Sequence, residues 1–258
     1  MNFLTQGALS GSMPEMECET ILDLRVNRVS MDQALEAIQG FIAARVPRHV
    51  VTADASMAII ARGDRDLHSI VERADLITPD GAGILWASKL LGFPLRHKVS
   101  GVDMVGKLCA LSVEHGYRLY FLGAAPGVAQ AAADKLRIAY PGTQIVGLHD
   151  GYFTKEQEPA LLEEISAAKP DVLLVAFGIP KQEKWIDAHK SSLGVPVSIG
   201  IGGSFDVYSG LVQRAPLWMQ RNGLEWLHRL SKNPKKIGKV MTLPQFALLI
   251  LRRKIFGR

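Results

Sequence analysis

The chain contains little cysteine and none of three common catalytic or nucleotide-binding motifs. Of its 258 residues only Cys18 and Cys109 are cysteine, and they form no Cys-x-x-Cys pair. Two cysteines do not make a disulfide framework, so the sequence fits a reducing cytoplasm. The seven histidines are scattered, and no Walker A, H-E-x-x-H or G-x-S-x-G motif is present. The sequence therefore does not point to a P-loop nucleotidase, an H-E-x-x-H zinc protease or an α/β-hydrolase.

Long hydrophobic runs are missing as well. Residues 243–251 (LPQFALLIL) are apolar, but the segment is far shorter than the ~20 residues needed to cross a bilayer. Residues 1–20 lack a basic stretch followed by an apolar run, so we interpret them as a flexible extension and not as a signal peptide. We expect a cytoplasmic protein that can lie on a membrane but cannot span one.

Acidic residues are absent from the end of the chain. After Glu225 there is no Asp or Glu, and nine residues are Lys or Arg. Because the whole chain has a net charge of only +5, the part before this tail is slightly acidic. Such an asymmetry indicates a localised anionic partner, for example a membrane surface, and not general nucleic-acid binding. We expect a main domain over residues 21–225 and a small basic appendage over residues 226–258.

Strand-like runs rich in β-branched residues alternate with helix-like segments through most of the chain. The strand-like runs are residues 21–26, 49–54, 75–81, 117–124, 143–152, 171–178 and 195–203, and the helix-like segments are 31–46, 56–74, 82–92, 127–140 and 155–169. The alternation predicts an α/β fold with a doubly wound, mostly parallel, Rossmann-like sheet. Ligands bind outside the carboxyl ends of such strands, so the ends of 171–178 and 195–203 are expected to converge on one site.

Two carboxylates follow neighbouring strand-like runs. Asp80 lies in the turn Thr78-Pro79-Asp80-Gly81-Ala82-Gly83, and Asp54 follows Val51-Thr52-Ala53. Each carboxylate could cap the helix that follows, since Asp is favoured at that position. Each could also face a ligand, and a carboxylate there is a candidate general base. For Asp80 the two interpretations are about equally supported by the local sequence.

Two other motifs give weaker signals. Neither the turn FLGAAPG at 121–127 nor GIGG at 200–203 matches G-x-G-x-x-G, although the first could present backbone N–H groups to a phosphate. Asp64-Arg65-Asp66 has the form Asp-x-Asp, which can hold a divalent cation on a diphosphate. It lies in the charged segment RGDRDLH, where a solvated turn is the favoured interpretation. Without a metal, diphosphate charge must be neutralised by Arg, Lys or backbone dipoles.

A set of short motifs, in this order, resembles the WecG/TagA/CpsF family of bacterial glycosyltransferases. The motifs that carry the resemblance are Val51-Thr52 with a polar residue at 54, Pro79-Asp80-Gly81, Gly101-Val102-Asp103, Gly178-Ile179-Pro180-Lys181-Gln182-Glu183, Gly202-Gly203-Ser204-Phe205-Asp206, Arg214-Ala215-Pro216 and Glu225-Trp226. The resemblance runs from about residue 21 to about residue 239.

The resemblance implies an inverting, metal-independent transfer that needs no cofactor. The sugar, typically N-acetylmannosamine or a relative, moves from a UDP donor to an undecaprenyl-diphosphate-linked amino sugar, in the synthesis of cell-surface polysaccharide. The general base falls on Asp80. The residues implied to bind substrate are Thr52, Asp54, Lys98, Gly123, Lys181, Gln182, Gly203, Asp206, Arg229, Lys236 and Lys239. The appendage is implied to contact the inner face of the cytoplasmic membrane, where a homo-oligomer could dissociate.

Three positions depart from the family pattern. Position 54 is usually Asn and is Asp here, which adds a negative charge or a second candidate base. Position 98 is usually Arg and is Lys, and the usual Pro-x-Arg-x-x-Arg reads Pro234-Lys235-Lys236-Ile237-Gly238-Lys239. Lysine keeps the charge of arginine but loses its bidentate fork, so a shifted donor or acceptor preference is plausible.

Two alternatives stay open on the sequence alone. A nucleotide-cofactor oxidoreductase is suggested only by the α/β alternation and the glycine turns. A non-catalytic membrane-docking protein is suggested only by the basic tail.

Overall fold

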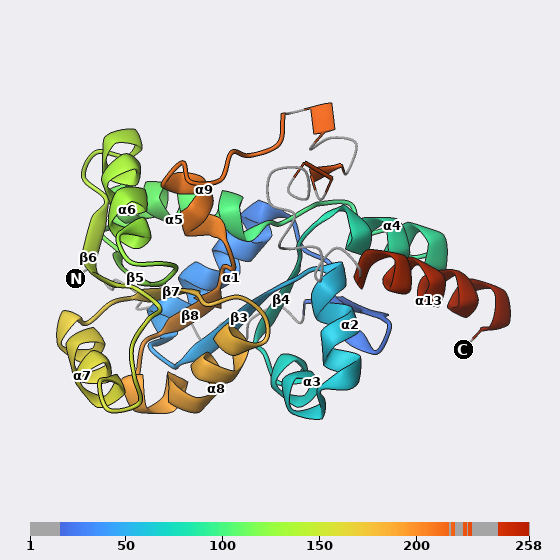
Figure 1. The fold of residues 1–258 in the computed structure, drawn as a ribbon, viewed down its shortest axis with the longest axis horizontal. Helices are drawn as coiled ribbons and strands as arrows, with labels where there is room; N and C mark the ends of the chain where they lie inside the picture. The colour runs from blue at the N-terminus through green and yellow to red at the C-terminus, as the bar shows by residue number, and fades with distance from the viewer. Residues whose placement is uncertain (1–15, 217, 220–223, 226, 229–241, 258) are drawn as a thin grey trace, which may run out of the picture.

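A six-stranded sheet, parallel throughout, runs through the middle of the protein (Figure 1). The computed structural model describes residues 16–216, 218–219, 224–225, 227–228 and 242–257. In spatial order the strands are β4 (Leu76–Pro79), β3 (Arg48–Ala53), β8 (Val197–Gly200), β7 (Val172–Ala176), β5 (Arg118–Gly123) and β6 (Gln144–His149). The predicted parallel α/β sheet is therefore confirmed.

Helices cover both faces of this sheet, which explains why its strands are continuously apolar. Successive residues point to opposite faces: Leu174 joins one buried cluster and Val175 another. One face carries α1 (Met31–Ala44), α5 (Gly101–His115), α6 (Val128–Ala139) and α9 (Ser204–Tyr208). The other carries α2 (Ala55–Gly63), α3 (Arg65–Glu72), α4 (Ala82–Leu91), α7 (Glu158–Ala168), α8 (Lys181–Leu193) and α13 (Thr242–Phe256).

Some predicted elements differ from the structure. The expected strand at 21–26 is a hairpin, in which β1 (Cys18–Ile21) pairs antiparallel with β2 (Leu24–Asn27). Leu22 and Asp23 both have positive φ, 49° and 68°, as the tight turn of a two-residue hairpin requires. Strand β1 thus begins inside the range 1–20, and helices α5 and α8 are absent from the predicted elements.

The helix-like segment 56–74 is two helices, which Asp64 separates inside the charged segment where a turn was expected. Its backbone is extended, with φ −128° and ψ 95°, which ends α2. Its side chain then accepts the N–H of Leu67 and caps the start of α3. The capping aspartate therefore interrupts a segment whose sequence is helical on both sides.

The last helix packs back onto the main body. Phe246 and Ile250 of α13 are 2% and 0% exposed, and they join the cluster formed by α2 and α4. Residues 229–241 lie outside the described part of the chain, so the basic appendage and the division at 225 and 226 stay predictions. Within the described ranges, none of the helices has both the length and the apolar character of a membrane span.

Candidate active site

The carboxyl ends of β3, β4, β7 and β8 meet, as the strand pattern predicts. Thr52 pairs in register with Thr78 on β4, and its Oγ1 donates to the Gly200 carbonyl on β8 at 2.8 Å. The Asp80 N–H donates to the Ala53 carbonyl at 2.9 Å. Asp54 and Asp80 therefore follow adjacent strands, next to the loop that leaves β8.

Asp80 does not cap the helix that follows it. The N-cap of α4 is Gly81, with φ 89° and no side-chain cap, so the capping interpretation is wrong for Asp80 on its own helix. Instead, Oδ2 of Asp80 accepts the N–H of Gly101, the first residue of α5, at 3.1 Å. The N-terminal end of a helix carries partial positive charge, which favours a carboxylate at this place. This contact orients the side chain at the strand end.

Asp54 does act as a helix cap. Its Oδ1 accepts the Met57 N–H at 2.8 Å at the start of α2. The position is also close to the Asp80 turn, since a Cβ placed on Gly81 would lie 4.0 Å from the Cβ of Asp54. The capping interpretation is confirmed for Asp54, and a contact with substrate stays a prediction.

Gln182 joins the ends of β7 and β8. The side chain is 1% exposed, and its Oε1 accepts the N–H groups of Gly178 and Gly202, each at 3.0 Å. Its Nε2 donates to Oε1 of Glu183 at 2.8 Å. Gly200 leaves the room for this amide, because a Cβ there would lie 2.5 Å from Nε2. Gln182 thus shapes the loops of the site, whereas a direct hold on a sugar stays a prediction.

Four of the other predicted residues lie at strand ends or helix starts: Gly123, Lys181, Gly203 and Asp206. Gly123 ends β5 with φ 118°, where a Cβ would lie 2.7 Å from the Ala176 carbonyl carbon, so glycine is required by the neighbouring strand. Gly203 precedes α9, which carries Asp206. Lys181 begins α8, and its Nζ lies 4.9 Å from the centre of the Phe177 ring. Arg229, Lys236 and Lys239 lie outside the described residues.

Lys98 belongs to a set of four alternating charges that we name the charge chain: Lys98, Glu225, Arg214 and Asp103. Nζ of Lys98 lies 3.1 Å from Oε2 of Glu225, and Nε of Arg214 lies 3.9 Å from Oε1 of Glu225. The Arg214 guanidinium donates to both Asp103 oxygens, at 2.7 and 3.0 Å. These contacts bring three of the sequence motifs together next to the start of α5.

The charge chain sets the ionisation of Asp103. Burial on its own raises the pKa of this carboxyl, but hydrogen bonds from Arg214 and Ser100, with the positive charges of Arg214 and Lys98, outweigh burial and hold the pKa below its usual value. The hydrogen bond to Asp103 in turn raises the pKa of Arg214. Both groups are therefore charged at neutral pH.

Asp103, Arg214 and Glu225 are absent from the predicted site residues. Each is nevertheless the charged member of one of the motifs quoted above. The sequence did contain a signal for these residues, because each is charged and stands in a motif with glycine, proline or tryptophan. The partner of each charge could not be predicted from the sequence. The separations, 111 residues between Asp103 and Arg214 and 127 between Lys98 and Glu225, explain why.

The Asp64-Arg65-Asp66 segment, expected as a solvated turn, is the start of a helix: Asp64 separates α2 from α3, and Arg65 and Asp66 are the first residues of α3. Besides capping α3, Asp64 lies 2.8 Å from Nζ of Lys184, and Asp66 lies 3.2 Å from the same atom. The hydrogen bond from Lys184 lowers the pKa of Asp64. The two carboxylates thus share one lysine. Within the described ranges, no three His, Cys, Asp or Glu side chains gather as metal ligands do.

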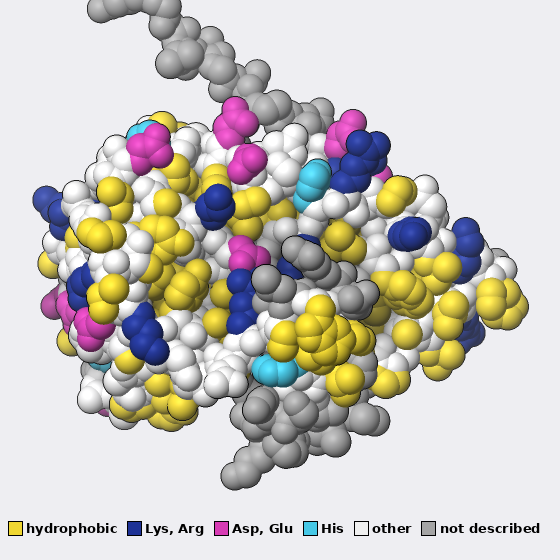
Figure 2. Space-filling view, turned by 90° about the horizontal axis from the view of Figure 1, so that it is seen from above, with side chains coloured by type: hydrophobic (Ala, Val, Ile, Leu, Met, Phe, Trp, Pro, Cys, Tyr) yellow, Lys and Arg dark blue, Asp and Glu magenta, His cyan; other side chains and the backbone are white. Residues whose placement is uncertain are grey.

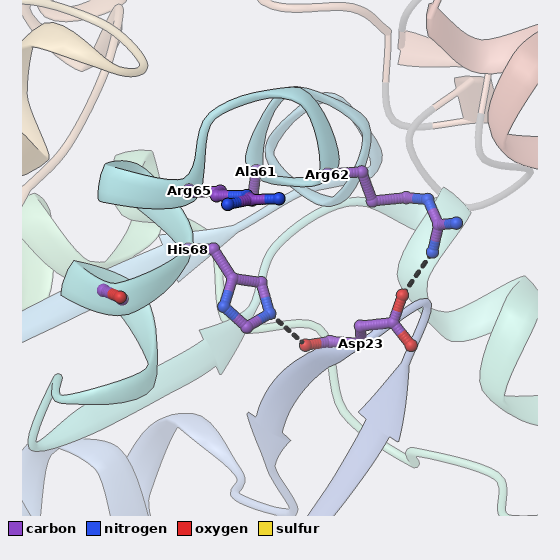
Figure 3. A pocket seen from close by; sticks show the side chains of 6 residues that line it. Asp23, Ala61, Arg62, Arg65 and His68 are labelled. Atoms are coloured by element: carbon purple, nitrogen blue, oxygen red, sulfur yellow. Dashed lines mark hydrogen bonds and ion pairs between the residues drawn. The ribbon is translucent and has the colours of Figure 1, made fainter.

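A separate hollow opens beside the β1–β2 turn (Figure 3). Arg62 forms an ion pair with Asp23, and Nε2 of His68 lies 2.9 Å from the Asp23 carbonyl oxygen. Because Arg62 is near the end of α2 and Asp54 caps its start, the hollow is about two helical turns from the strand ends. Its polar groups serve the packing of the hairpin on α2 and α3.

Comparison with known proteins agrees with the motifs at the strand ends. A model of the glycosyl transferase WecG/TagA/CpsF family matches residues 19–258. The chain belongs to this family.

Relatives of similar length support the assignment to the WecG/TagA/CpsF family. An N-acetylglucosaminyldiphosphoundecaprenol N-acetyl-beta-D-mannosaminyltransferase of Bacillus subtilis (strain 168) is 32% identical over 240 residues, which cover 93% of both chains. The enzyme of the same name from Bacillus spizizenii is 34% identical over 205 residues, 80% of this chain and 79% of the relative. That of Staphylococcus aureus (strain MW2) is 30% identical over 236 residues, 91% and 92% of the two chains.

Membership of the WecG/TagA/CpsF family makes the protein a glycosyltransferase. It decides against both alternatives left open by the sequence, the oxidoreductase and the non-catalytic docking protein. The strand ends that the fold brings together are the candidate active site, since ligands of open α/β sheets bind there.

Proposed function

We propose that the protein transfers an N-acetylmannosamine-type sugar from a UDP donor to an undecaprenyl-diphosphate-linked amino sugar, with inversion and without a metal. The relatives act, by name, on an N-acetylglucosaminyldiphosphoundecaprenol acceptor and transfer an N-acetyl-β-D-mannosaminyl group. The single structural observation that carries the proposal is Asp80, whose carboxylate is held at the end of β4 by the start of α5.

In the proposed reaction Asp80 is the general base. The acceptor hydroxyl loses its proton to the Asp80 carboxylate as its oxygen bonds to the anomeric carbon of the donor sugar. The bond from that carbon to the phosphate oxygen breaks, and UDP leaves with the electron pair. Attack on the face opposite the leaving group inverts the configuration. The Gly101 N–H keeps one oxygen of Asp80 in place.

Lysines and arginines replace a metal in this proposal. The leaving diphosphate develops negative charge, which cationic side chains stabilise when they are already in place. Among the described residues, Lys98 is the candidate for this role. The other candidates are Arg229, Lys236 and Lys239, which lie outside the described residues. Thr52, Gln182 and Gly203 line the strand ends from which the donor would be approached. Lys181 and Asp206 lie at the starts of α8 and α9, and Gly123 ends β5.

The exchange of the usual Asn for Asp at position 54 is compatible with the fold. The residue caps α2 through one side-chain oxygen, and Asn and Asp cap helices about equally well. The substitution therefore keeps the helix start and adds a negative charge beside the Asp80 turn. We propose that this charge tunes donor or acceptor preference.

The proposed membrane contact is through α13. Leu248, Leu251, Ile255 and Phe256 are 66%, 44%, 71% and 70% exposed, and Arg252, Arg253 and Lys254 lie among them. Figure 2 shows hydrophobic side chains gathered at the end of the molecule where Figure 1 places α4 and α13. Exposed apolar side chains next to basic ones are typical of a helix that lies in a membrane interface. The oligomeric state stays a prediction.

Surface substitutions test this contact better than deletion of the tail, because deletion would also remove Phe246 and Ile250 from the core. Leu248→Ser with Ile255→Ser should reduce sedimentation with vesicles that contain phosphatidylglycerol. Ile138→Ser is the matched control, since Ile138 is 79% exposed on α6. Equal binding of both variants would place the contact elsewhere.

The reaction itself is tested by UDP release. The full-length protein is given UDP-N-acetylmannosamine, UDP-N-acetylglucosamine, UDP-glucose or the uronic acid of the first, with a polyprenyl-diphosphate-linked N-acetylglucosamine, in EDTA. Acceptor-dependent release from one donor is the expected result, and NMR of the product reports the anomeric configuration. Release only after Mg²⁺ or Mn²⁺ is added would contradict the metal-independent mechanism.

A further inference from the structure

We infer that Asp103, Arg214 and Glu225 are positioning residues that hold the Lys98 ammonium ready for the diphosphate of the donor. The inference rests on the proposed function, in which Lys98 contacts that group. It concerns the remaining three members of the charge chain, for which the proposed reaction has no other use.

Lys98 needs such a holder because its side chain is flexible. A lysine ammonium sits on a four-carbon stem and loses considerable rotamer entropy when it is fixed. Here Glu225 takes the ammonium at 3.1 Å, and the two side chains are only 25% and 21% exposed. Part of the cost of ordering Lys98 is thus met before any donor arrives, which is how preorganisation raises affinity.

Arg214 makes the arrangement one from which Lys98 can be released. Its terminal nitrogens donate to Asp103, and its Nε faces the other oxygen of Glu225 at 3.9 Å. A guanidinium has donors enough to serve both carboxylates at once. When one N–H of the Lys98 ammonium turns to a phosphate oxygen, Glu225 therefore still has the Arg214 guanidinium beside it. The donor does not have to leave a carboxylate unpaired in a partly buried place, which would oppose binding.

Asp103 connects the charge chain to the start of α5, which also holds Asp80, the proposed general base. Ser100 caps α5 and donates to Oδ2 of Asp103 at 2.6 Å, and Gly101 donates to Asp80. The Lys98 ammonium and the Asp80 carboxylate are therefore both connected to the first turn of α5, Lys98 through the charge chain and Asp80 through Gly101. A shift of that turn would therefore act on both groups.

The test is a double-mutant cycle with UDP as the probe. We measure the UDP dissociation constant by calorimetry for the wild type, Glu225→Gln, Lys98→Met and the double variant, together with donor KM and kcat. Glu225→Gln should weaken UDP binding and raise KM about three- to tenfold, with kcat within about twofold. In the Lys98→Met background the same change should have no further effect, because its action passes through Lys98.

Further variants separate positioning from folding. Glu17→Gln is the matched control, since it removes a surface carboxylate that pairs with Arg28, and it should change nothing. Asp103→Asn keeps the shape of the side chain and should give a smaller loss of the same kind, while Glu225→Asp should restore part of the affinity. Thermal unfolding of each variant checks the fold, and Asp103→Asn serves if Glu225→Gln does not fold.

The outcomes separate the positioning role of Glu225 from the proposed UDP donor. Additive losses, unchanged affinity or tighter UDP binding in Glu225→Gln would overturn the positioning role while the donor assignment stands. A wild-type protein that does not bind UDP at all would overturn the proposed donor and this inference with it.

Discussion

Oδ2 of Asp80 accepts the backbone N–H of Gly101 at 3.1 Å, so the carboxylate that ends β4 is held by the first residue of α5. Twenty residues of chain separate the two, including the whole of α4. The contact gives a strand-end loop the rigidity of a helix terminus. It also makes Asp80 a group whose position depends on the packing of α5 and not on its own turn alone.

Replacing Asp80 by Asn should remove most of the catalysis and little of the stability. An amide oxygen can still accept the Gly101 N–H, but an amide cannot take a proton from the acceptor. We expect kcat to fall about 10²–10⁴-fold, the usual contribution of general base catalysis. Asp32→Asn, on the exposed start of α1, is the control and should keep full turnover. Full turnover in Asp80→Asn would remove Asp80 from the mechanism.

Replacing Gln182 by Ala should destabilise the fold. Two backbone N–H groups, of Gly178 and Gly202, would lose their acceptor in a partly buried place. Each unsatisfied donor costs about 1–3 kcal/mol, so we expect a loss of about 2–5 kcal/mol in the free energy of unfolding, measured by urea denaturation. Gln130→Ala is the control, because the exposed Gln130 donates to Asp134 of the next turn on the same helix. Equal midpoints for both variants would show that Gln182 does not clamp the loops.

Replacing Gly123 by Ala should be more harmful than replacing Gly127 by Ala. Both glycines have positive φ, 118° and 81°, so a side chain strains the backbone at either position. At Gly123 the new Cβ would also meet the Ala176 backbone at 2.7 Å, whereas at Gly127 no atom of the described residues lies within 4 Å. We expect the free energy of unfolding to fall by about 3 kcal/mol or more in Gly123→Ala and by about 1 kcal/mol in Gly127→Ala. Similar melting temperatures would mean that β5 and β7 can move apart.

His49 should make the protein less stable in acid. The side chain is 0% exposed and, within the described part of the chain, neither ring nitrogen has a hydrogen-bond partner. Burial lowers its pKa to about 4, Lys190 adds to the shift, and Asp187 and Asp75 oppose it. Between pH 6.5 and about 4 the unfolded chain therefore binds a proton that the folded protein does not. The free energy of unfolding is therefore highest above this pH range and decreases by about 3 kcal/mol as the pH is lowered through it.

The measurement is the free energy of unfolding at pH 7 and at pH 4.5. His49→Leu should lose much of the difference between the two values, since the variant has no group to protonate there. His115→Leu, at the exposed end of α5, should keep the wild-type difference. An unchanged pH dependence in His49→Leu would assign the acid sensitivity to other groups.

The local sequence determined most of the strands and helices, whereas Asp80 as the general base came from the family resemblance and stays a prediction. Short apolar runs with β-branched residues, such as 171–178, favour strands buried on both faces, and their alternation with helix-like segments predicts a parallel α/β sheet. The turn around Asp80 and the GIPKQE motif, with the other short motifs, sufficed to indicate the family. Local rules also explain where the prediction was wrong. The turn at Leu22 and Asp23 needs two positive φ angles from residues that rarely adopt them, and Asp64 stops one helix and caps the next.

Tertiary structure alone decided which groups meet. The strand order β4-β3-β8-β7-β5-β6 sets β8 beside β3, so Thr52 reaches Gly200 across 148 residues of chain. The same folding assembles the charge chain from two segments more than 100 positions apart and buries Gln182 between two loops. Propensity and periodicity act over a few residues, whereas these contacts depend on how whole strands and helices pack. For this reason Asp103, Arg214 and Glu225 appear in the sequence only as charged letters in short motifs, and as one network only in the fold.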